Sequence, residues 1–425
     1  MAAHDFEDRP PSREGVRGSF SLLRRNPDFR RLYVAQLISF GGDWFLIVAL
    51  FPLILDLTHS PIMVSIALAA QELPFFFASP FAGILADRLN RKRLMVNSDL
   101  ARAALCCGFL LVNDRGTVWL AFLLLVVTSS FSTVFDPAST ASVPNIVEEE
   151  DLGAANALVG SAWGTMLAVG AALGGIVASA FGTHTAFLVD AASFLLSALL
   201  LVRISRPMSQ PLEAGEEHPG VAEATRETIR YSREDHRVLA LLVVKGGFGL
   251  AAGVLVLLSV FAKEVFHSGS VGFGVLMAAR GVGALIGPFL ARRIAGRDDR
   301  RLFSAIGLSL VTFGVFYAAF SVMPNLLLAA LVVMGAHLGG GSQWMLSTYG
   351  LQKIVPDRIR GRVFAFDFAL ITLTITASSL LAGWAAAHWG PRPAALALSL
   401  IALAWAAIWW SATRAVRREP LVARS

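Results

Sequence analysis

Apolar residues gather in runs of roughly 20 residues along almost the whole chain, and short polar connections separate the runs. As an α-helix, a run of that length is long enough to cross the hydrocarbon core of a bilayer. The runs also lack the polar face that a soluble helix needs. They cover twelve ranges: 32–56, 62–86, 94–113, 117–137, 154–181, 184–203, 238–262, 270–291, 302–321, 325–347, 362–388 and 391–412. The pattern predicts an all-α membrane protein with twelve transmembrane helices.

The pattern also repeats within the chain. A shift of 208 positions lays the second half on the first without a gap, and it places His267 on His59 and Gly390 on Gly182. Each match alone is weak, but the register stays constant from run to run. A doubled helical membrane protein is typical of transporters built from two related bundles. We therefore expect two pseudo-symmetric six-helix bundles.

The polar segments set the expected domain boundaries. The longest of them lies between the sixth and seventh runs, and we expect it to be part helical and part loose. The predicted division is a cytoplasmic segment at 1–31, an N-terminal bundle at 32–203, a cytoplasmic linker at 204–237, a C-terminal bundle at 238–412 and a cytoplasmic tail at 413–425.

Composition and charge agree with this picture and orient it. Only 16% of the residues are charged, against roughly 25% in soluble domains, and the mean hydropathy is +0.63. Lysine and arginine gather in the N-terminal segment, the even-numbered connections and the tail, so we expect both termini to be cytoplasmic in a bacterial inner membrane. This asymmetry explains the net charge of +6 without a nucleic-acid partner. The expected partners are the bilayer and a small molecule.

Signatures of soluble-enzyme chemistry are missing from the sequence. It contains no GxxxxGK[ST] phosphate loop, no GxSxG or HExxH motif and no CxxC pair. The eight histidines are scattered, so no metal site is expected. Cys106 and Cys107 lie within a run, where small apolar packing is the favoured interpretation. We therefore expect neither an enzyme nor a bound cofactor, and an ion gradient becomes the expected energy source.

The loop between the second and third runs reads Gly-Ile-Leu-Ala-Asp-Arg-Leu-Asn-Arg-Lys-Arg over residues 83–93. It resembles the signature loop of the major facilitator superfamily, with Asn90 where glycine is usual. Asparagine tolerates the left-handed conformation best after glycine, so we expect a similar turn there. The resemblance implies a cytoplasmic gate made by Gly83, Asp87, Arg88, Arg91 and Lys92. The alternative is an ordinary basic loop that sets topology.

Other segments narrow the resemblance to a branch of that superfamily. Gly42-Asp43-Trp44, Gln71-Glu72-Leu73-Pro74 and Val355-Pro356-Asp357 are similar to segments of macrolide-efflux proteins and enterobactin exporters. This similarity implies a twelve-helix antiporter. It would export an amphipathic drug, siderophore or secondary metabolite by alternating access in exchange for protons. Two alternatives stay open: a flippase for lysophospholipid, and a transporter-like receptor or scaffold without turnover. We expect a monomer.

Ionisable residues within membrane spans are costly and are therefore functional candidates. Asp43 and Glu72 lie near the middle of the first and second spans, and the repeat places Arg280 on Glu72. Asp99 and Arg102 are spaced to pair on one helix face. Lys245 is within side-chain reach of the depth of Asp43. Each could instead be a structural ion pair that orients helices.

Asp43 is the preferred proton carrier, because the first span lines the central cavity in the family that this chain resembles. A carboxyl group at that depth can bind a proton in one state and release it in another. Side chains from the first, seventh and tenth spans could supply an apolar pocket, although each could equally serve in packing. These candidates are Phe40, Trp44, Phe248, Gln343, Trp344 and Met345.

Overall fold

The computed structural model describes residues 16–209, 221–295 and 300–418. Within these ranges the chain is almost entirely helical and contains no strand. Twelve helical segments are long and apolar enough to cross a membrane. They coincide with the twelve predicted runs, and five of the helices extend beyond them by a turn or more. The prediction of an all-α membrane protein is confirmed.

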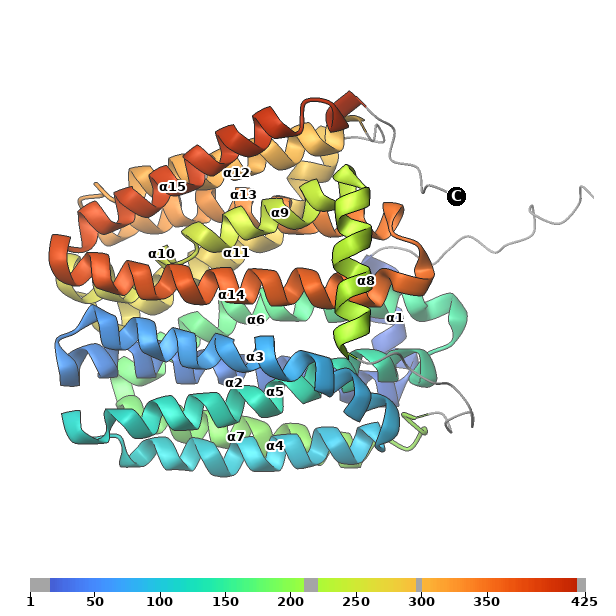
Figure 1. Cartoon of the computed structure of the whole chain (residues 1–425). Helices are drawn as coiled ribbons and strands as arrows, with labels where there is room; N and C mark the ends of the chain where they lie inside the picture. The colour runs from blue at the N-terminus through green and yellow to red at the C-terminus, as the bar shows by residue number, and fades with distance from the viewer. Residues whose placement is uncertain (1–15, 210–220, 296–299, 419–425) are drawn as a thin grey trace, which may run out of the picture.

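The N-terminal half contains six long helices that lie side by side (Figure 1). A short helix, α1 (Val16–Arg25), precedes them, and single 3-10 turns flank α5. The six are α2 (Pro27–Thr58), α3 (Pro61–Arg88), α4 (Arg91–Gly108), α5 (Val118–Ile146), α6 (Leu152–Phe181) and α7 (Thr183–Val202).

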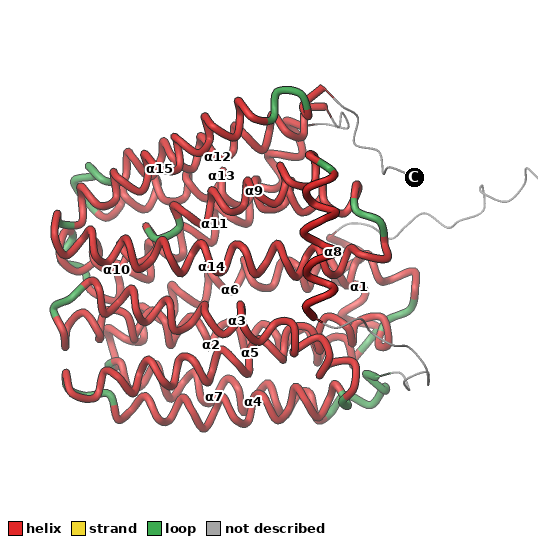
Figure 2. The backbone as a smooth tube through the Cα atoms, in the orientation of Figure 1, coloured by secondary structure: helices red, strands yellow, loops and turns green. Residues whose placement is uncertain are grey.

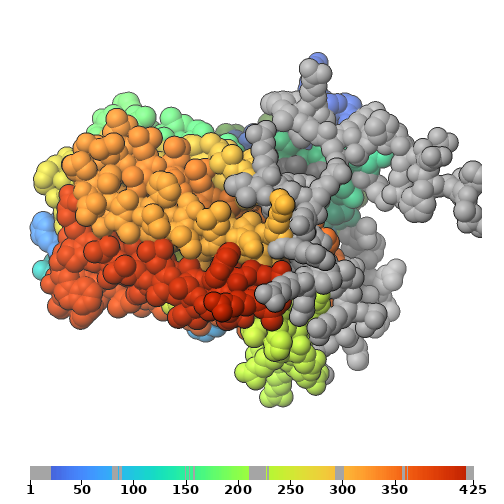
Figure 3. All heavy atoms as spheres, turned by 90° about the horizontal axis from the view of Figure 1, so that it is seen from above, coloured from blue at the N-terminus to red at the C-terminus, as the bar shows by residue number. Residues whose placement is uncertain are grey.

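The C-terminal half repeats this arrangement, and its helices form a second layer above the first in the view of Figure 1. Its first span is built from three pieces: α9 (His236–Ala251), α10 (Val254–Val260) and a π-helical turn, η4 (Phe261–Val265). The others are α11 (Gly269–Ala295), α12 (Arg300–Phe320), α13 (Leu326–Ile354), α14 (Asp357–Trp389) and α15 (Pro391–Ala412). Figure 3 shows the molecule from above. Helices of the C-terminal half cover most of the visible face, and the N-terminal half is visible only at the edges of that face.

One further helix, α8 (Val221–Glu234), lies between the halves in sequence and falls within the predicted linker. It runs across the direction of the long helices at one end of the bundle (Figure 1). Helix α1 and the end of the described C-terminal chain lie at that same end, which we call the terminal end. The turns drawn in green in Figure 2 lie at the two ends of the bundle, apart from the break between α9 and α10.

Local sequence signals explain where the first span begins and ends. The Asn26 side chain accepts a hydrogen bond from the Phe29 amide at 2.9 Å, and proline follows at the first helical position. The helix ends where His59 adopts a left-handed conformation, with φ of 50°. Pro61 then begins α3, where it needs no amide hydrogen-bond partner.

Backbone conformation confirms the internal repeat. The two non-glycine residues with positive φ in the described chain are His59, at 50°, and His267, at 51°. Such angles are uncommon for histidine. Gly182 and Gly390 have φ of 87° and 84°, values that glycine adopts without strain. Both pairs are separated by the 208 positions found in the sequence, so each half ends its first and fifth spans with the same turn.

The two halves contact each other through equivalent helices, with α6 against α11 and α3 against α14. Gly175 and Gly383, which the repeat also relates, allow this approach. A Cβ atom on Gly175 would lie 2.8 Å from the Ser270 carbonyl oxygen, and one on Gly383 would lie 2.2 Å from Ser65 Oγ. Nearer the terminal end, a Cβ on Gly160 of α6 would meet nothing within 4 Å. A Cβ on Gly281 of α11 would lie 2.5 Å from the Ala168 amide nitrogen, so the close α6–α11 contact continues from the far end to the middle of α6.

Two more contacts hold the halves together at the far end. Asp56, near the end of α2, forms an ion pair with Lys263 in η4. The Phe51 and Phe273 rings stack with their centroids 6.1 Å apart. Large aromatic surfaces and a rim ion pair therefore close this side of the interface.

Which end faces the cytoplasm follows only from the lysine and arginine bias, and cysteine labelling tests it. We expect a cysteine at Thr183 to react with a membrane-impermeant maleimide in intact cells, and one at Glu148 to react only after permeabilisation. Glu148 is exposed at the terminal end, and Thr183 lies at the opposite end. A Cys107→Ser background removes the exposed native thiol. The reverse labelling pattern would contradict the orientation.

Candidate functional site

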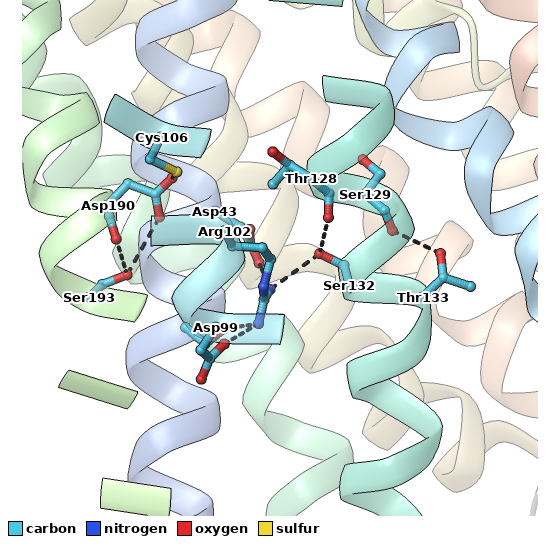
Figure 4. Close-up of polar contacts among 11 residues, drawn as sticks. Asp43, Asp99, Arg102, Cys106, Thr128, Ser129, Ser132, Thr133, Asp190 and Ser193 are labelled. Atoms are coloured by element: carbon cyan, nitrogen blue, oxygen red, sulfur yellow. Dashed lines mark hydrogen bonds and ion pairs between the residues drawn. The ribbon is translucent and has the colours of Figure 1, made fainter. Parts of the chain in front are cut away.

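The interior of the N-terminal half holds four carboxylates around one guanidinium, that of Arg102. We call this set the carboxylate cluster: Asp43 from α2, Asp99 from α4, Asp136 from α5 and Asp190 from α7. Figure 4 shows Asp43, Asp99 and Asp190 approaching the same region from three helices. The cluster lies within a half of the protein, away from the end contacts described above.

Arg102 is fixed by polar and aromatic neighbours. Its Nη2 atom donates to Asp99 Oδ1 in a close ion pair, as the sequence spacing predicted. Ser39 and Ser132 accept hydrogen bonds of 3.2 Å from its two terminal nitrogens. The guanidinium carbon also lies 4.2 Å from the centroid of the Phe194 ring. A cation held in this way has little freedom to leave the cluster.

Asp43 and Asp136 are the half-buried members of the cluster, and Asp43 has the closer approach to Arg102 in the described contacts. Asp43 lies at the middle of α2, a helix of 32 residues, which confirms the depth expected from the sequence. Its side chain is 29% exposed, whereas the Asp99 and Arg102 side chains are at most 2% exposed. Asp43 Oδ2 lies 3.9 Å from Arg102 Nη1, so the two charges interact without a hydrogen bond.

A glycine next to Asp43 lets a carboxylate from another helix approach. A Cβ on Gly42 would lie 2.3 Å from Asp190 Oδ1 and 2.0 Å from Ser193 Oγ. The absence of a side chain at this position therefore brings α7 against α2. Asp190 is fully buried, and the thiol of Cys106 donates to its Oδ2 at 3.0 Å. Cys106 thus serves as a hydrogen-bond donor, beyond the packing role expected from the sequence.

The charge balance of the cluster has a chemical consequence. Asp136 and Asp190 both lie within electrostatic range of Asp43 and of Arg102. One guanidinium cannot neutralise four ionised carboxylates, and the other polar groups that contact the cluster in the described structure are hydroxyls and a thiol. Uncompensated charges are strongly disfavoured within a membrane-spanning bundle. The cluster therefore favours binding protons on some of its carboxyl groups.

The C-terminal half contains a different charged group. Lys245 of α9 forms a close ion pair with Asp367 of α14 and donates to Thr348 Oγ1 of α13 at 3.0 Å. Its ammonium also lies 4.8 Å from the Trp344 ring centroid. The sequence had suggested that Lys245 could pair with Asp43, but the structure pairs it with Asp367 inside its own half.

A third charged group lies where the halves meet. Arg280 of α11 faces two tryptophans of the N-terminal half, with its guanidinium 5.9 Å from the Trp44 ring and 5.8 Å from the Trp163 ring. Glu72 lies within electrostatic range across the interface, but the two do not form an ion pair in the described structure. Both lie eleven residues after the start of their helices, so the predicted equal depth of opposite charges is confirmed.

The remaining pocket candidates divide among several environments. Trp44 contacts Arg280, and Trp344 contacts Lys245. Phe248 is buried against Phe313, with ring centroids 4.8 Å apart. Gln343 is buried and donates to the Val244 carbonyl at 2.9 Å, while its own Oε1 has no hydrogen-bond partner. Phe40 is half-buried, and half-buried Met345 packs in the core of the C-terminal half. These side chains do not form a single group.

The signature loop is only partly described. The backbone of Gly83, Asp87 and Arg88 belongs to α3, but the side chains of Asp87 and Arg88 lie outside what the structure describes. Arg91 donates from Nη1 to the Ala141 carbonyl at 2.7 Å, and Lys92 donates to the Ile204 carbonyl at 2.8 Å. These bonds connect the start of α4 with the ends of α5 and α7.

The prediction of a left-handed turn at Asn90 is wrong. Asn90 has φ of −63°, and its side chain accepts a hydrogen bond of 3.1 Å from the Arg93 amide. It caps the N-terminus of α4, a role that asparagine performs well and glycine performs without a side-chain bond.

Sequence analysis missed three membrane carboxylates, namely Asp136, Asp190 and Asp367. The same rule that selected Asp43 would have found Asp190 and Asp367, because both lie within predicted spans. Asp136 lies at the edge of a predicted run, where a charge looks like the end of the span. Their partners could not be predicted, because depth along a helix does not say which way a side chain points.

Comparison with known proteins yields one family. The profile of the family described as "Transmembrane secretion effector" matches residues 17–420. The chain is also similar to the putative bacilysin exporter BacE of Bacillus subtilis, with 26% identity over 361 residues, 85% of this chain and 89% of that protein. Its similarity to the enterobactin exporter EntS of Citrobacter koseri is 26% identity over 359 residues, 81% of this chain and 82% of that protein.

Solved structures agree on the fold. A bacterial homologue of the human lysosomal transporter Spinster, in an inward-facing and unoccupied conformation, superposes with a TM-score of 0.72. The superposition covers 96% of this chain and 100% of that one, at 14% identity. An identity this low supports the arrangement of helices and nothing more specific.

Proposed function

Because this chain belongs to the transmembrane secretion effector family of the major facilitator superfamily, we propose that it exports a small amphipathic compound in exchange for protons. It is a multi-pass membrane transporter rather than an enzyme. Two relatives are named as exporters, one of bacilysin and one of enterobactin. These names support the direction of transport and a secondary metabolite, drug or siderophore as the substrate class.

The observation that carries proton exchange is the charge balance of the carboxylate cluster. Asp99 and Asp43 lie next to Arg102, Asp136 and Asp190 lie within its electrostatic range, and Asp43 is partly exposed. Proton binding at Asp43 neutralises it, and proton release restores its attraction to Arg102. A group that alternates between these states can couple the proton gradient to a change of conformation.

The interface between the halves supports a substrate path. Trp44, Trp163 and Glu72 come from one half and Arg280 from the other, so charged and aromatic groups of both halves meet. A scaffold without turnover would not need charges there. The halves are held together at the far end by the Asp56–Lys263 ion pair and the Phe51–Phe273 stack. We propose that these contacts separate during alternating access, as an opening between the halves moves from one end to the other.

Transport by purified protein in sealed vesicles tests the proposal. The full chain is reconstituted with a pH-sensitive dye inside, and bacilysin, enterobactin and a labelled lysophospholipid are offered under an imposed pH gradient. We expect the gradient to drive uphill movement of an amphipathic compound, with protons moving the opposite way. Empty vesicles are the control.

The other outcomes separate the alternatives. Movement of the lysophospholipid alone would identify a flippase. Transport that ignores the gradient would contradict antiport and leave facilitated diffusion. An absence of any transport would favour a receptor or scaffold. We further propose a monomer in the bacterial inner membrane with both termini in the cytoplasm, and this placement rests on the lysine and arginine bias.

A further inference from the structure

Arg280 is an unusual cation among the charged side chains of the interior. Arg102 and Lys245 each have a carboxylate in close contact, whereas Arg280 forms no ion pair in the part of the chain that the structure describes. Within the described residues its hydrogen bond runs from Nη1 to Met277 Sδ at 3.8 Å, and a thioether is a weak acceptor. Its Nε is buried without a partner. Donors left in this state at depth usually have a functional reason.

The surroundings of Arg280 favour a ligand rather than a permanent protein partner. Trp44 and Trp163 belong to α2 and α6 of the opposite half, and Trp163 is 45% exposed. In the C-terminal half, to which Arg280 belongs, Tyr317 and His337 form a hydrogen bond, with Oη and Nε2 2.8 Å apart. Arg280 is within electrostatic range of both of these side chains. The guanidinium thus lies between aromatic walls from one half and polar groups from the other.

The physical chemistry of this arrangement selects a class of ligand. A guanidinium presents a planar fork of donors that matches the two oxygens of a carboxylate. The indole rings beside the guanidinium offer large apolar surfaces for the rest of a ligand that carries such a carboxylate. Glu72 lies within electrostatic range of Arg280, yet it does not form an ion pair with the guanidinium in the described structure. A neutral compound would leave the fork unsatisfied.

We propose that Arg280 binds the anionic group of the exported compound, with Trp44 and Trp163 contacting its apolar body. This inference rests on the proposed export function and adds to it a substrate class, that of amphipathic anions with a carboxylate or a similar pair of oxygens. Arg280 would then be a specificity-determining residue located between the halves.

Binding of three matched probes tests the inference without transport. Naphthylacetate, naphthylacetamide and naphthylethylammonium share an apolar body and differ in charge. They are titrated calorimetrically into the full chain in nanodiscs of zwitterionic lipid, with empty nanodiscs as the blank. Charge-assisted hydrogen bonds predict that the carboxylate binds on the order of tenfold or more tightly than the amide. Equal binding, or no binding of the carboxylate, would overturn the proposal.

Variants locate the effect. Arg280→Gln should remove the preference for the carboxylate and leave the amide unchanged, and Arg280→Lys should keep part of it. Arg115→Gln, an exposed arginine at the far end, is the matched control and should behave as wild type. If Arg280→Gln does not fold, Trp163→Leu remains informative, because it should weaken all three probes and keep the charge preference. A preference that survives in folded Arg280→Gln, or is lost in Trp163→Leu, refutes the assignment.

The binding experiment and the transport experiment can contradict the two proposals independently. Proton-driven export with no preference for anions would remove this inference and leave the proposed function intact. A carboxylate preference that depends on Arg280, in a protein that moves nothing across vesicles, would remove the proposed function and leave the binding site.

Discussion

Replacing Asp43 with asparagine is expected to reduce uphill export in vesicles to the level of empty vesicles, while exchange of substrate without a gradient continues. Asparagine keeps the size and the hydrogen bonding of the side chain, but it cannot take up and release a proton. Asp43 is a half-buried carboxylate of the cluster and lies 3.9 Å from Arg102 Nη1. Substrate accumulation and dye-reported proton flux under an imposed gradient measure the two activities separately.

Glu148→Gln is the control for this experiment, because Glu148 is exposed at the terminal end and lies outside the cluster. It should transport like the wild type. Undiminished uphill export by Asp43→Asn would exclude Asp43 as the proton carrier. The next candidate would then be Glu72, at a similar depth in α3.

Removing one partner of the buried Lys245–Asp367 pair should destabilise the protein strongly, by about 3–5 kcal/mol, because an uncompensated charge is left in the interior. Both side chains are at most 6% exposed. The double variant Lys245→Met with Asp367→Leu should recover most of the loss, because neither charge remains. Midpoints of thermal unfolding for the purified single and double variants measure this coupling.

The ion pair between Asp56 and Lys263 provides a matched comparison at the rim. Its carboxylate is 60% exposed and its ammonium 25% exposed. Exposed pairs contribute roughly 0–1 kcal/mol, so Lys263→Met should shift the midpoint much less. Equal losses in Lys245→Met and Lys263→Met, or no recovery in the double variant, would show that burial does not set the energy of the inner pair.

The sequence was sufficient to predict the arrangement of helices. Runs of apolar residues are a direct consequence of the bilayer, and the constant shift of 208 positions reappears as equal backbone angles at His59 and His267. The ion pair within α4 could also be predicted from the sequence, since Asp99 and Arg102 lie one turn apart. These features depend on chain length and local spacing, which the sequence states explicitly.

Contacts between helices were harder to predict. Lys245 was placed at the correct depth but with the wrong partner, because the rotation of α9 and α14 about their axes follows from packing. Asp190 reaches the cluster only because Gly42 leaves room for it. The importance of Gly42 could not be recognised without knowing that α7 crosses α2 at that position.

The close contact between α6 and α11 has a mechanical consequence. Glycines bring the two helices together at Gly175 and again where Gly281 meets Ala168, and from Ala168 the chain of α6 extends toward Leu152 for about 24 Å at 1.5 Å per residue. A straight helix that pivots at this contact acts as a lever. A tilt of about 10° would move the Leu152 end by about 4 Å, while the atoms at the contact hardly move. The close packing of small residues along one part of the helix therefore turns slight rotations into larger displacements at its end.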